Sequence, residues 1–191
     1  MDLVTRHDVI EDVFALWPLG AARAAYSGHA YRVLNYSRRI LGTTREDEML
    51  AVASAFHDIG IWTDGTFDYL PPSIAHARAF VEERLPHLSS ETVRDIIANH
   101  HVLRRIHGGA SAPTIESFRL ADRVDVSRGL LGAGLDAGLR REITSAFPYA
   151  GFHGVLLRTA LRWMLRHPLR PLPMLRLSPA SEASPRATTR G

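Results

Sequence analysis

The chain has 191 residues and contains neither cysteine nor lysine. Without cysteine it can form no disulfide and offers no thiolate, so any bound metal must be held by nitrogen and oxygen ligands. Its ten histidines make such a site possible. Without lysine, all 23 basic residues are arginine, a bias that genomic base composition can produce as readily as function can.

Long apolar segments are also missing. No apolar run approaches the ~20 residues of a membrane-spanning helix, and no cationic and apolar signal segment opens the chain. We therefore expect no membrane span and a cytoplasmic protein. The hydrophobic content is nonetheless 46%, which at this length is enough for one domain with a full hydrophobic core.

The positive charge is confined to one end of the chain. Residues 1–157 hold 16 arginines against 19 acidic residues, a net charge of −3, whereas residues 158–191 hold 7 arginines and one glutamate, a net charge of +6. A basic end beside a slightly acidic body is not the pattern of a nucleic-acid groove. We expect no nucleic-acid partner.

No stretch alternates between apolar and polar residues with β-branched enrichment, so strands are not expected. Helical spacing predicts instead an all-α fold, a compact multi-helix bundle over residues 1–175, followed by a basic, disordered tail over 176–191 whose last part is Ser178–Gly191. The predicted helices cover residues 8–17, 21–41, 47–60, 73–85, 90–101, 114–128 and 153–166. The glycine-rich stretch before the last helix predicts a flexible connector.

Residue types at the helix ends support these boundaries. Pro18 and Gly42 are expected to end the first two helices. N-terminal caps are predicted where Ser, Thr or Asp precedes a helix, strengthened where Glu follows three residues later. The predicted caps are Asp8 with Glu11, Thr43 with Glu46, Ser73, and Ser89 or Ser90.

The last helix, 153–166, has an apolar face and an arginine-rich face. We expect the apolar face to dock on the domain. A membrane surface or a second copy of the chain is the alternative partner, so a homodimer remains possible.

A turn-rich stretch with three aromatic residues follows Gly60. One interpretation is an aromatic plug over the core. The other is a wall that faces a substrate, because loops on rigid scaffolds often carry function, and it makes Trp62 and Asp64 candidate substrate contacts.

Polar residues interrupt the apolar faces of four predicted helices. They are His29, the adjacent pair His57-Asp58, His100 and Asp122. A single such histidine is most often a satisfied core residue, and Asp122 alone would suit an ion pair with Arg119 or Arg123. Imidazoles and carboxylates that converge from four helices are, however, a common way to build a metal site in an all-α domain. The pair His7-Asp8 has no such companions.

The order of these residues resembles the HD-domain superfamily of metal-dependent phosphohydrolases over about residues 25–130. The resemblance is carried by three stretches of the sequence, namely Gly-His-Ala-Tyr-Arg-Val at 28–33, Phe-His-Asp-Ile-Gly at 56–60, and Leu-Ala-Asp-Arg-Val-Asp at 120–125. It implies a divalent transition metal, Fe, Mn, Zn, Co or Ni, bound between the helices.

The resemblance also implies roles for single residues. His29, His57, Asp58 and Asp122 would bind one ion. Members with two ions add histidines after the doublet, and His76 and His100 stand in that order, with Asp58 then bridging both ions and taking part in catalysis. One or two ions remain open, and the pattern favours two. We expect His101 to lie behind the ligands and hold them, because adjacent helical residues point about 100° apart.

The function expected from this resemblance is hydrolysis of a phosphate ester of a small nucleotide or phosphorylated metabolite by metal-activated hydroxide. Arg32 and Arg104 are candidates to hold the substrate phosphate, and a solvated cationic face is the alternative for Arg104 and its neighbour Arg105. Two other functions remain open. One is an HD-type di-iron oxygenase, which requires both His76 and His100, and the other is a non-catalytic metal-binding HD protein.

Overall fold

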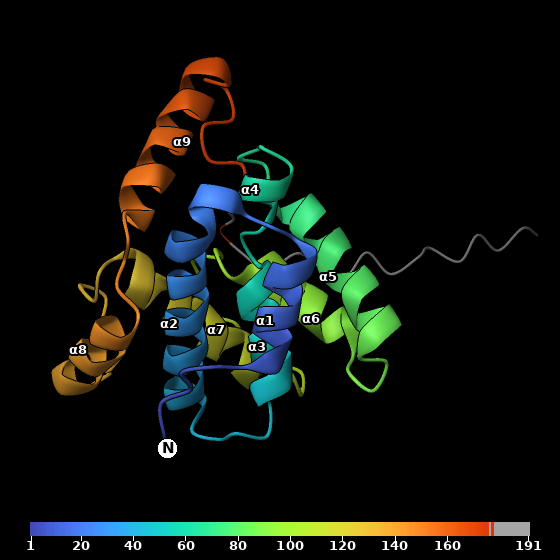
Figure 1. Ribbon diagram of the computed structural model, residues 1–191, viewed down its shortest axis with the longest axis vertical. Coiled ribbons are helices and arrows are strands. Elements are labelled where there is room, and N and C mark those ends of the chain that lie inside the picture. Colours follow the sequence, from blue (N-terminus) through green and yellow to red (C-terminus); the bar gives the residue numbers. More distant parts are fainter. Residues whose placement is uncertain (176, 178–191) are drawn as a thin grey trace, which may run out of the picture.

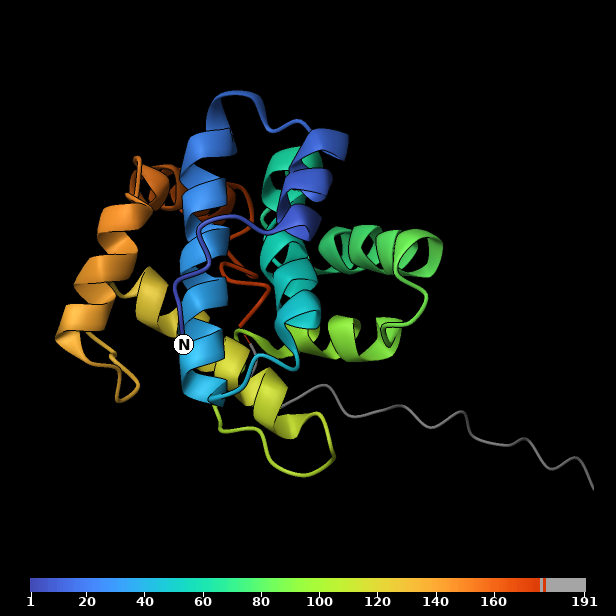
Figure 2. The same cartoon turned by 60° about the horizontal axis from the view of Figure 1, so that its bottom comes forward.

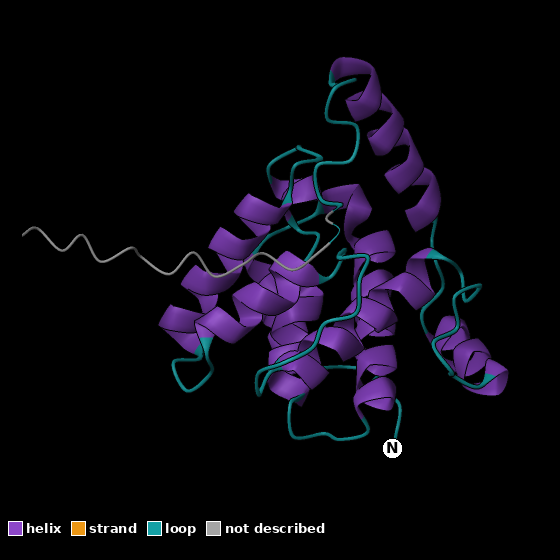
Figure 3. Ribbon diagram, turned by 180° about the vertical axis from the view of Figure 1, so that it is seen from behind, coloured by secondary structure: helices purple, strands orange, loops and turns teal. Residues whose placement is uncertain are grey.

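A computed structural model describes residues 1–175 and residue 177, and within them the fold is all-α, as predicted (Figure 1; Figure 3). The predicted disorder of Ser178–Gly191 concerns residues outside this described part. The elements, in chain order, are α1 (Asp8–Leu16), the 3-10 turn η1 (Gly20–Ala22), α2 (Arg23–Leu41), α3 (Asp47–Phe56), α4 (Gly60–Thr63), α5 (Leu70–Arg84), α6 (Ser90–Asn99), α7 (Ala112–Val126), α8 (Ala137–Ala146) and α9 (Phe152–Arg166).

Helices α2 and α7 form the centre of the fold and make its most extensive helix–helix contact. Helix α3 packs on α2, α1 packs on α3, and α5 and α6 lie together on the far side of α3 from α2 (Figure 2). Every residue from Leu50 to Phe56 in α3 is buried, because neighbours surround this helix. The core therefore runs between α2, α3 and α7, where the predicted polar residues also lie.

Three of the predicted helix ends are confirmed. Helix α1 ends at Leu16 with Trp17 as its C-cap, directly before Pro18. Gly42 follows α2 with φ of 76°, a left-handed conformation that glycine adopts without steric cost, and Ser89 caps α6 by accepting a hydrogen bond from the Thr92 amide. Three other caps are wrong. Asp8 is the first residue of α1 and caps nothing, Glu46 precedes α3 without a side-chain cap, and α5 starts at Leu70, three residues before Ser73.

The uncapped side chains have other partners. Glu11 accepts a hydrogen bond from the Tyr31 hydroxyl, and the Thr43 hydroxyl accepts one from the Arg45 amide. Ser73 accepts a hydrogen bond from the Gly60 amide and so ties α5 to the turn after α3. A partner from elsewhere in the fold replaces the local cap at Glu11 and Ser73.

The predicted connector contains a helix that the sequence analysis missed. Helix α8 begins after Asp136, whose carboxylate accepts hydrogen bonds from the Gly138 and Leu139 amides. Because an Asp cap compensates for the glycine in the first turn, the glycine count was a misleading signal.

Helix α9 has one docked face and one exposed face. Leu156, Ala160 and Trp163 pack against the core, whereas Leu161 and Leu165 are exposed. The docking of the apolar face is thus confirmed in part, and the possible homodimer stays a prediction. None of the helices in the described part of the chain is both long enough and apolar enough to cross a membrane.

After α9 the chain turns back toward α4 (Figure 1). Met174 is buried in the core, and the Arg104 amide donates a hydrogen bond to the Leu177 carbonyl. This returning segment therefore lies near the end of α6, beside His100 and His101.

Candidate metal centre

His57 and Asp58 occupy the sharp turn between the end of α3 and the start of α4. The Tyr26 hydroxyl holds this turn by donating to the Ala55 carbonyl at 2.9 Å and accepting from the Asp58 amide at 3.2 Å. Gly60 is required because a Cβ there would lie 2.9 Å from the Tyr69 carbonyl oxygen. The turn is buried, so both side chains point into the protein instead of into water.

His29 of α2 and His57 face each other, with their Nε2 atoms 2.9 Å apart. The Nδ1–H of His29 donates to Asp125 at 2.7 Å, and the Nδ1–H of His57 donates to the Ser54 carbonyl at 3.0 Å. With the proton of each ring on Nδ1, the two Nε2 atoms face each other as acceptors. Burial lowers the pKa of His57 to about 3, so this ring is neutral near pH 7. Two facing lone pairs call for a cation between or beside them.

Asp58 and Asp122 bring carboxylates to the same point. Oδ2 of Asp58 lies 3.7 Å from His29 Nε2 and 3.6 Å from His57 Nε2, while Oδ1 of Asp122 lies 3.5 Å and 3.8 Å from the same two atoms. Burial raises the pKa of Asp122 to about 6. Burial acts the same way on Asp58, but His57 and His100 outweigh it and lower the pKa of Asp58. A divalent cation at this point would keep both carboxylates charged.

His100 reaches the other oxygen of Asp58. Its Nδ1–H donates to the Ile97 carbonyl at 2.7 Å, which leaves Nε2 facing Asp58 Oδ1 at 3.5 Å. The two Asp58 oxygens therefore lie near different histidines: Oδ2 is near His29 and His57, and Oδ1 is near His100. Two groups that could hold an ion share Asp58, namely His29, His57 and Asp58, and Asp58, His100 and His101.

His101 lies between Tyr69 and Asp122. Burial and the nearby carboxylates raise the pKa of Tyr69 well above its ordinary value, so the phenol stays protonated. Its hydroxyl donates a hydrogen bond to His101 Nε2 at 2.5 Å. His101 Nδ1 then faces Asp122 Oδ2 at 3.7 Å. His101 could join His100 as a ligand, but the Tyr69 bond favours the supporting position expected from the sequence.

Three buried atoms of the cluster have no hydrogen-bond partner in the described residues, namely Asp58 Oδ1, Asp122 Oδ1 and His100 Nε2. Leaving a buried polar atom unsatisfied costs about 1–3 kcal/mol, and more for a charged group. All three are acceptors or lone-pair donors that suit a divalent transition metal. The residues present therefore fit the metal that the sequence predicted.

Asp125, the last residue of the stretch Leu-Ala-Asp-Arg-Val-Asp at 120–125, has a role that the sequence did not predict. Its carboxylate accepts a hydrogen bond from His29 Nδ1. It also forms a bidentate salt bridge with Arg32, whose Nε and Nη2 lie 2.6 Å and 2.9 Å from its two oxygens. The spacing of the sequence could have predicted this pair. Asp125 lies three residues after Asp122 on α7, and Arg32 lies three residues after His29 on α2, so each shares a helix face with a clustered residue. This pair holds the His29 ring in place behind the cluster.

The assignment of Arg32 to substrate binding is therefore wrong. Arg32 is fully buried, and its remaining nitrogen donates to the carbonyls of Phe147 and Pro148. Arg104 is exposed and does not line the cavity next to the cluster. Its position therefore fits the alternative interpretation, an arginine on a solvated surface. Of the two predicted partners of Asp122, Arg119 instead pairs with Glu116 at 2.6 Å.

His76 lies apart from the cluster. Its Nε2 is 3.0 Å from Asp64 Oδ2, its ring packs edge-on against Trp17, and its side chain is 30% exposed. Because α5 begins at Leu70, His76 lies in the second turn of this helix and not in the first turn as expected. The proposed ligand role of His76 is not supported by the geometry, because Asp64 already takes its ring nitrogen.

The aromatic loop behaves mainly as a plug. Phe67 and Tyr69 are buried, and Trp62 packs against the core. Neither Trp62 nor Asp64 lines the cavity beside the cluster, so their predicted substrate contacts are not supported. Tyr69 is the residue of this loop that reaches the site, through His101.

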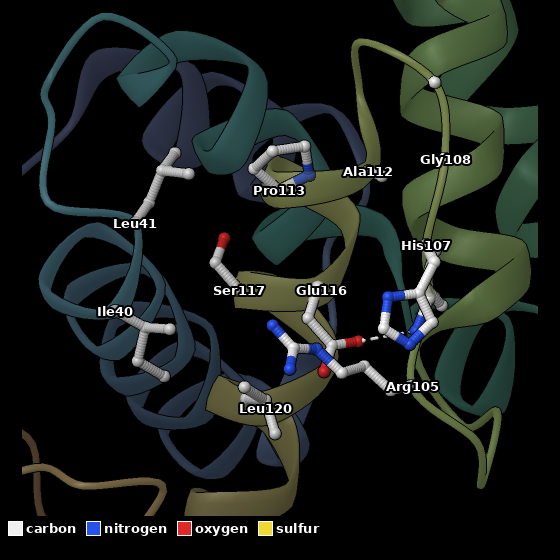
Figure 4. A pocket seen from close by; sticks show the side chains of 12 residues that line it. Ile40, Leu41, Arg105, His107, Gly108, Ala112, Pro113, Glu116, Ser117 and Leu120 are labelled. Atoms are coloured by element: carbon white, nitrogen blue, oxygen red, sulfur yellow. Dashed lines mark hydrogen bonds between the residues drawn. The ribbon is translucent and has the colours of Figure 1, made fainter.

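Two hollows lie along α7, one at each end of the helix. A cavity of about 190 Å³ opens on His100, His101 and Asp122. A larger hollow of about 460 Å³ lies at the start of α7, where Glu116 points toward the loop carrying Arg105 and His107 (Figure 4). The smaller cavity is the one that gives a ligand access to the cluster.

A family model for the HD domain matches residues 26–127, more than half of the chain. The chain therefore belongs to the HD-domain family, whose members are mostly metal-dependent hydrolases. No curated protein and no solved structure matches it. The matched residues run from α2 to α7, the helices that contribute the clustered histidines and aspartates.

Proposed function

We propose that the protein is a metal-dependent phosphohydrolase that cleaves a phosphate ester of a small phosphorylated metabolite or nucleotide. The observation that carries the proposal is the buried cluster on α2, α3, α6 and α7, in which three acceptor atoms lack partners within the described residues. Family membership supports the reaction class.

His29, His57, Asp58 and Asp122 hold one divalent ion in this proposal. A second ion would be held by Asp58 and His100, since Oδ1 of Asp58 lies 3.5 Å from Nε2 of His100. When bound, such ions lower the pKa of water toward ~7 and polarise a phosphoryl oxygen.

The surrounding residues orient the ligands. Asp125 and the Ser54 carbonyl fix the tautomers of His29 and His57, so that each presents Nε2. His101 and Tyr69 restrain Asp122 from the side of the cavity. The buried walls exclude bulk water from the reacting atoms, which strengthens the electrostatic interactions there.

The test is turnover of phosphate esters by the purified protein loaded separately with Mn, Fe, Co, Ni or Zn. His57→Ala and Asp58→Ala are expected to abolish metal-dependent turnover while circular dichroism shows unchanged helix content. Turnover that survives either substitution, or that persists in excess chelator, contradicts the proposal.

The oxygenase alternative is less well supported, because it requires His76 as a ligand and His76 is paired with Asp64. Oxygen consumption measured on the iron-loaded protein separates the two chemistries. A non-catalytic metal-binding role predicts bound metal with no turnover of any ester.

A further inference from the structure

The cavity of about 190 Å³ beside the cluster carries an inference about the substrate, which rests on the proposed function. Its inner end is formed by His100, His101 and Asp122, so a molecule in it lies against the metal ligands. Its outer part is formed by Arg123, Ser127 and four apolar side chains.

Arg123 is the cation of this cavity. Its Nη2 donates to the Val102 carbonyl at 3.3 Å, and no carboxylate in the described part of the chain lies within ion-pair distance of it. Glu116 and Asp122 act on its charge from farther away. Arg119, one helical turn earlier, is paired directly with Glu116. A guanidinium without a directly paired carboxylate next to a metal cluster suits a phosphate, because its forked donors match two phosphate oxygens.

Apart from Ser127, the rest of the outer wall is apolar. Leu103 follows α6, Val126 ends α7, Leu131 comes from the connector, and Leu175 comes from the segment that returns after α9. All four are exposed at the surface, between 36% and 56%. Four large apolar side chains around one small opening favour a substrate with an apolar group, since covering them removes apolar surface from water.

The cavity is small compared with the roughly 300–1,000 Å³ of sites that enclose drug-sized ligands. Because the cavity opens to the surface, this volume describes only the part of a ligand next to the cluster, which is a phosphoryl group and the first carbon atoms of its substituent. The single positive charge of Arg123 also matches the charge of one phosphate group better than that of a diphosphate or triphosphate.

We propose that this cavity binds a compact phosphomonoester, with the phosphate between the metal cluster and Arg123 and a small apolar substituent against Leu131 and Leu175. In the reaction, water adds its oxygen to phosphorus, the ester P–O bond breaks, and the alcohol leaves with a proton, so that inorganic phosphate and a free alcohol are formed.

The experiment compares KM and kcat of the full-length, metal-loaded protein for methyl phosphate, phenyl phosphate, a nucleoside 5′-monophosphate and pyrophosphate. Phenyl phosphate is expected to have the highest kcat/KM. Arg123→Ala should raise KM for methyl phosphate and phenyl phosphate about 10- to 100-fold, as expected for loss of a charge-assisted hydrogen-bonded pair, and Arg123→Lys should recover part of it. Arg39→Ala, which removes a charge from an exposed position on α2, is the matched control.

Leu131→Ala and Leu175→Ala test the apolar wall. Each should raise KM for phenyl phosphate by several-fold and leave KM for methyl phosphate almost unchanged, because only the phenyl group contacts the leucines. An unchanged KM in Arg123→Ala, or a nucleotide or pyrophosphate as the best substrate, overturns the proposal.

A binding measurement separates this proposal from the proposed function. Calorimetry with inorganic phosphate should show binding to the metal-loaded protein that weakens in Arg123→Ala. If no ester is hydrolysed with any metal but this loss is seen, the hydrolase function fails and the phosphate site stands. If esters are hydrolysed and Arg123→Ala binds phosphate normally, the site assignment fails alone.

Discussion

Substituting Asp125 with asparagine tests how the fold supports the metal cluster. Asp125 is fully buried and holds two groups at once, the Nδ1–H of His29 at 2.7 Å and the guanidinium of Arg32 at 2.6 and 2.9 Å. Asparagine keeps the shape of the side chain and can still accept from His29. What it removes is the negative charge, so Arg32 is left charged and buried.

The expected loss follows from that unpaired charge. Breaking a buried ion pair by removing one partner costs about 3–5 kcal/mol. For a domain of this size, each kcal/mol lowers Tm by about 2–4 °C, so Tm should fall by about 6–20 °C. Metal affinity should fall about 10- to 100-fold, since the hydrogen bond that orients His29 is weakened.

Thermal unfolding in chelator measures the first effect, and metal titration measures the second. Asp12→Asn, an exposed carboxylate on α1, is the control for loss of charge. The double variant Arg32→Met with Asp125→Leu should regain much of the stability, because no charge is left buried, but not the metal affinity. A Tm loss below about 2 °C in Asp125→Asn refutes the reasoning.

Further predictions concern pH, ligands and metal removal. Burial alone would raise the pKa of Glu116, but hydrogen bonds from Arg119 and the Ile106 amide lower it. This carboxylate therefore stabilises the fold above the unfolded pKa of ~4.3. The fold loses that contribution as pH falls through the folded pKa of Glu116. Glu116→Gln should therefore be less stable than the parent protein at pH 7, with the difference shrinking below about pH 4 in urea unfolding curves; a constant difference contradicts this. His76→Ala should leave the metal content unchanged and His100→Ala should lower it, by elemental analysis, whereas a metal loss in His76→Ala would restore the sequence-based ligand role. Chelation should lower the free energy of unfolding by about 2.7 kcal/mol relative to protein with metal at 100 times its dissociation constant, and equal stability with and without chelator would contradict a specific site.

The helices were largely predictable because apolar spacing is a local signal. The strong helix before His57 and the helix that ends at Gly42 lie almost where the pattern put them. The caps failed more often, since Ser73 bonds to the Gly60 amide instead of to its own helix. A competing partner from another element is not visible in the local sequence.

The clustered histidines and aspartates were predictable for a different reason. His29, Asp58 and Asp122 are polar residues on faces that are otherwise apolar, and burial without partners is costly enough to make such residues informative. The same argument could not place His76, because the sequence predicted it in the first turn of a helix, where a residue can face either solvent or the core, whereas the helix in fact begins at Leu70.

The arginines were the least predictable residues. Arg32 and Arg123 both lie one helical turn or less from a clustered residue, yet one is buried against Asp125 and the other lines the cavity. Their roles depend on which side chain faces them from another helix. Sequence spacing shows that an arginine is near the site but not which acid it meets.

The most direct test of the account is the metal content of the protein purified without added chelator, measured by elemental analysis beside Asp58→Ala. Asp58 contributes an oxygen to each of the two groups that could hold an ion. The account predicts one or two equivalents of a divalent transition metal per chain in the parent protein and little or none in folded Asp58→Ala. Equal metal content in the two proteins, or a parent protein that binds no such metal when it is supplied, would contradict it.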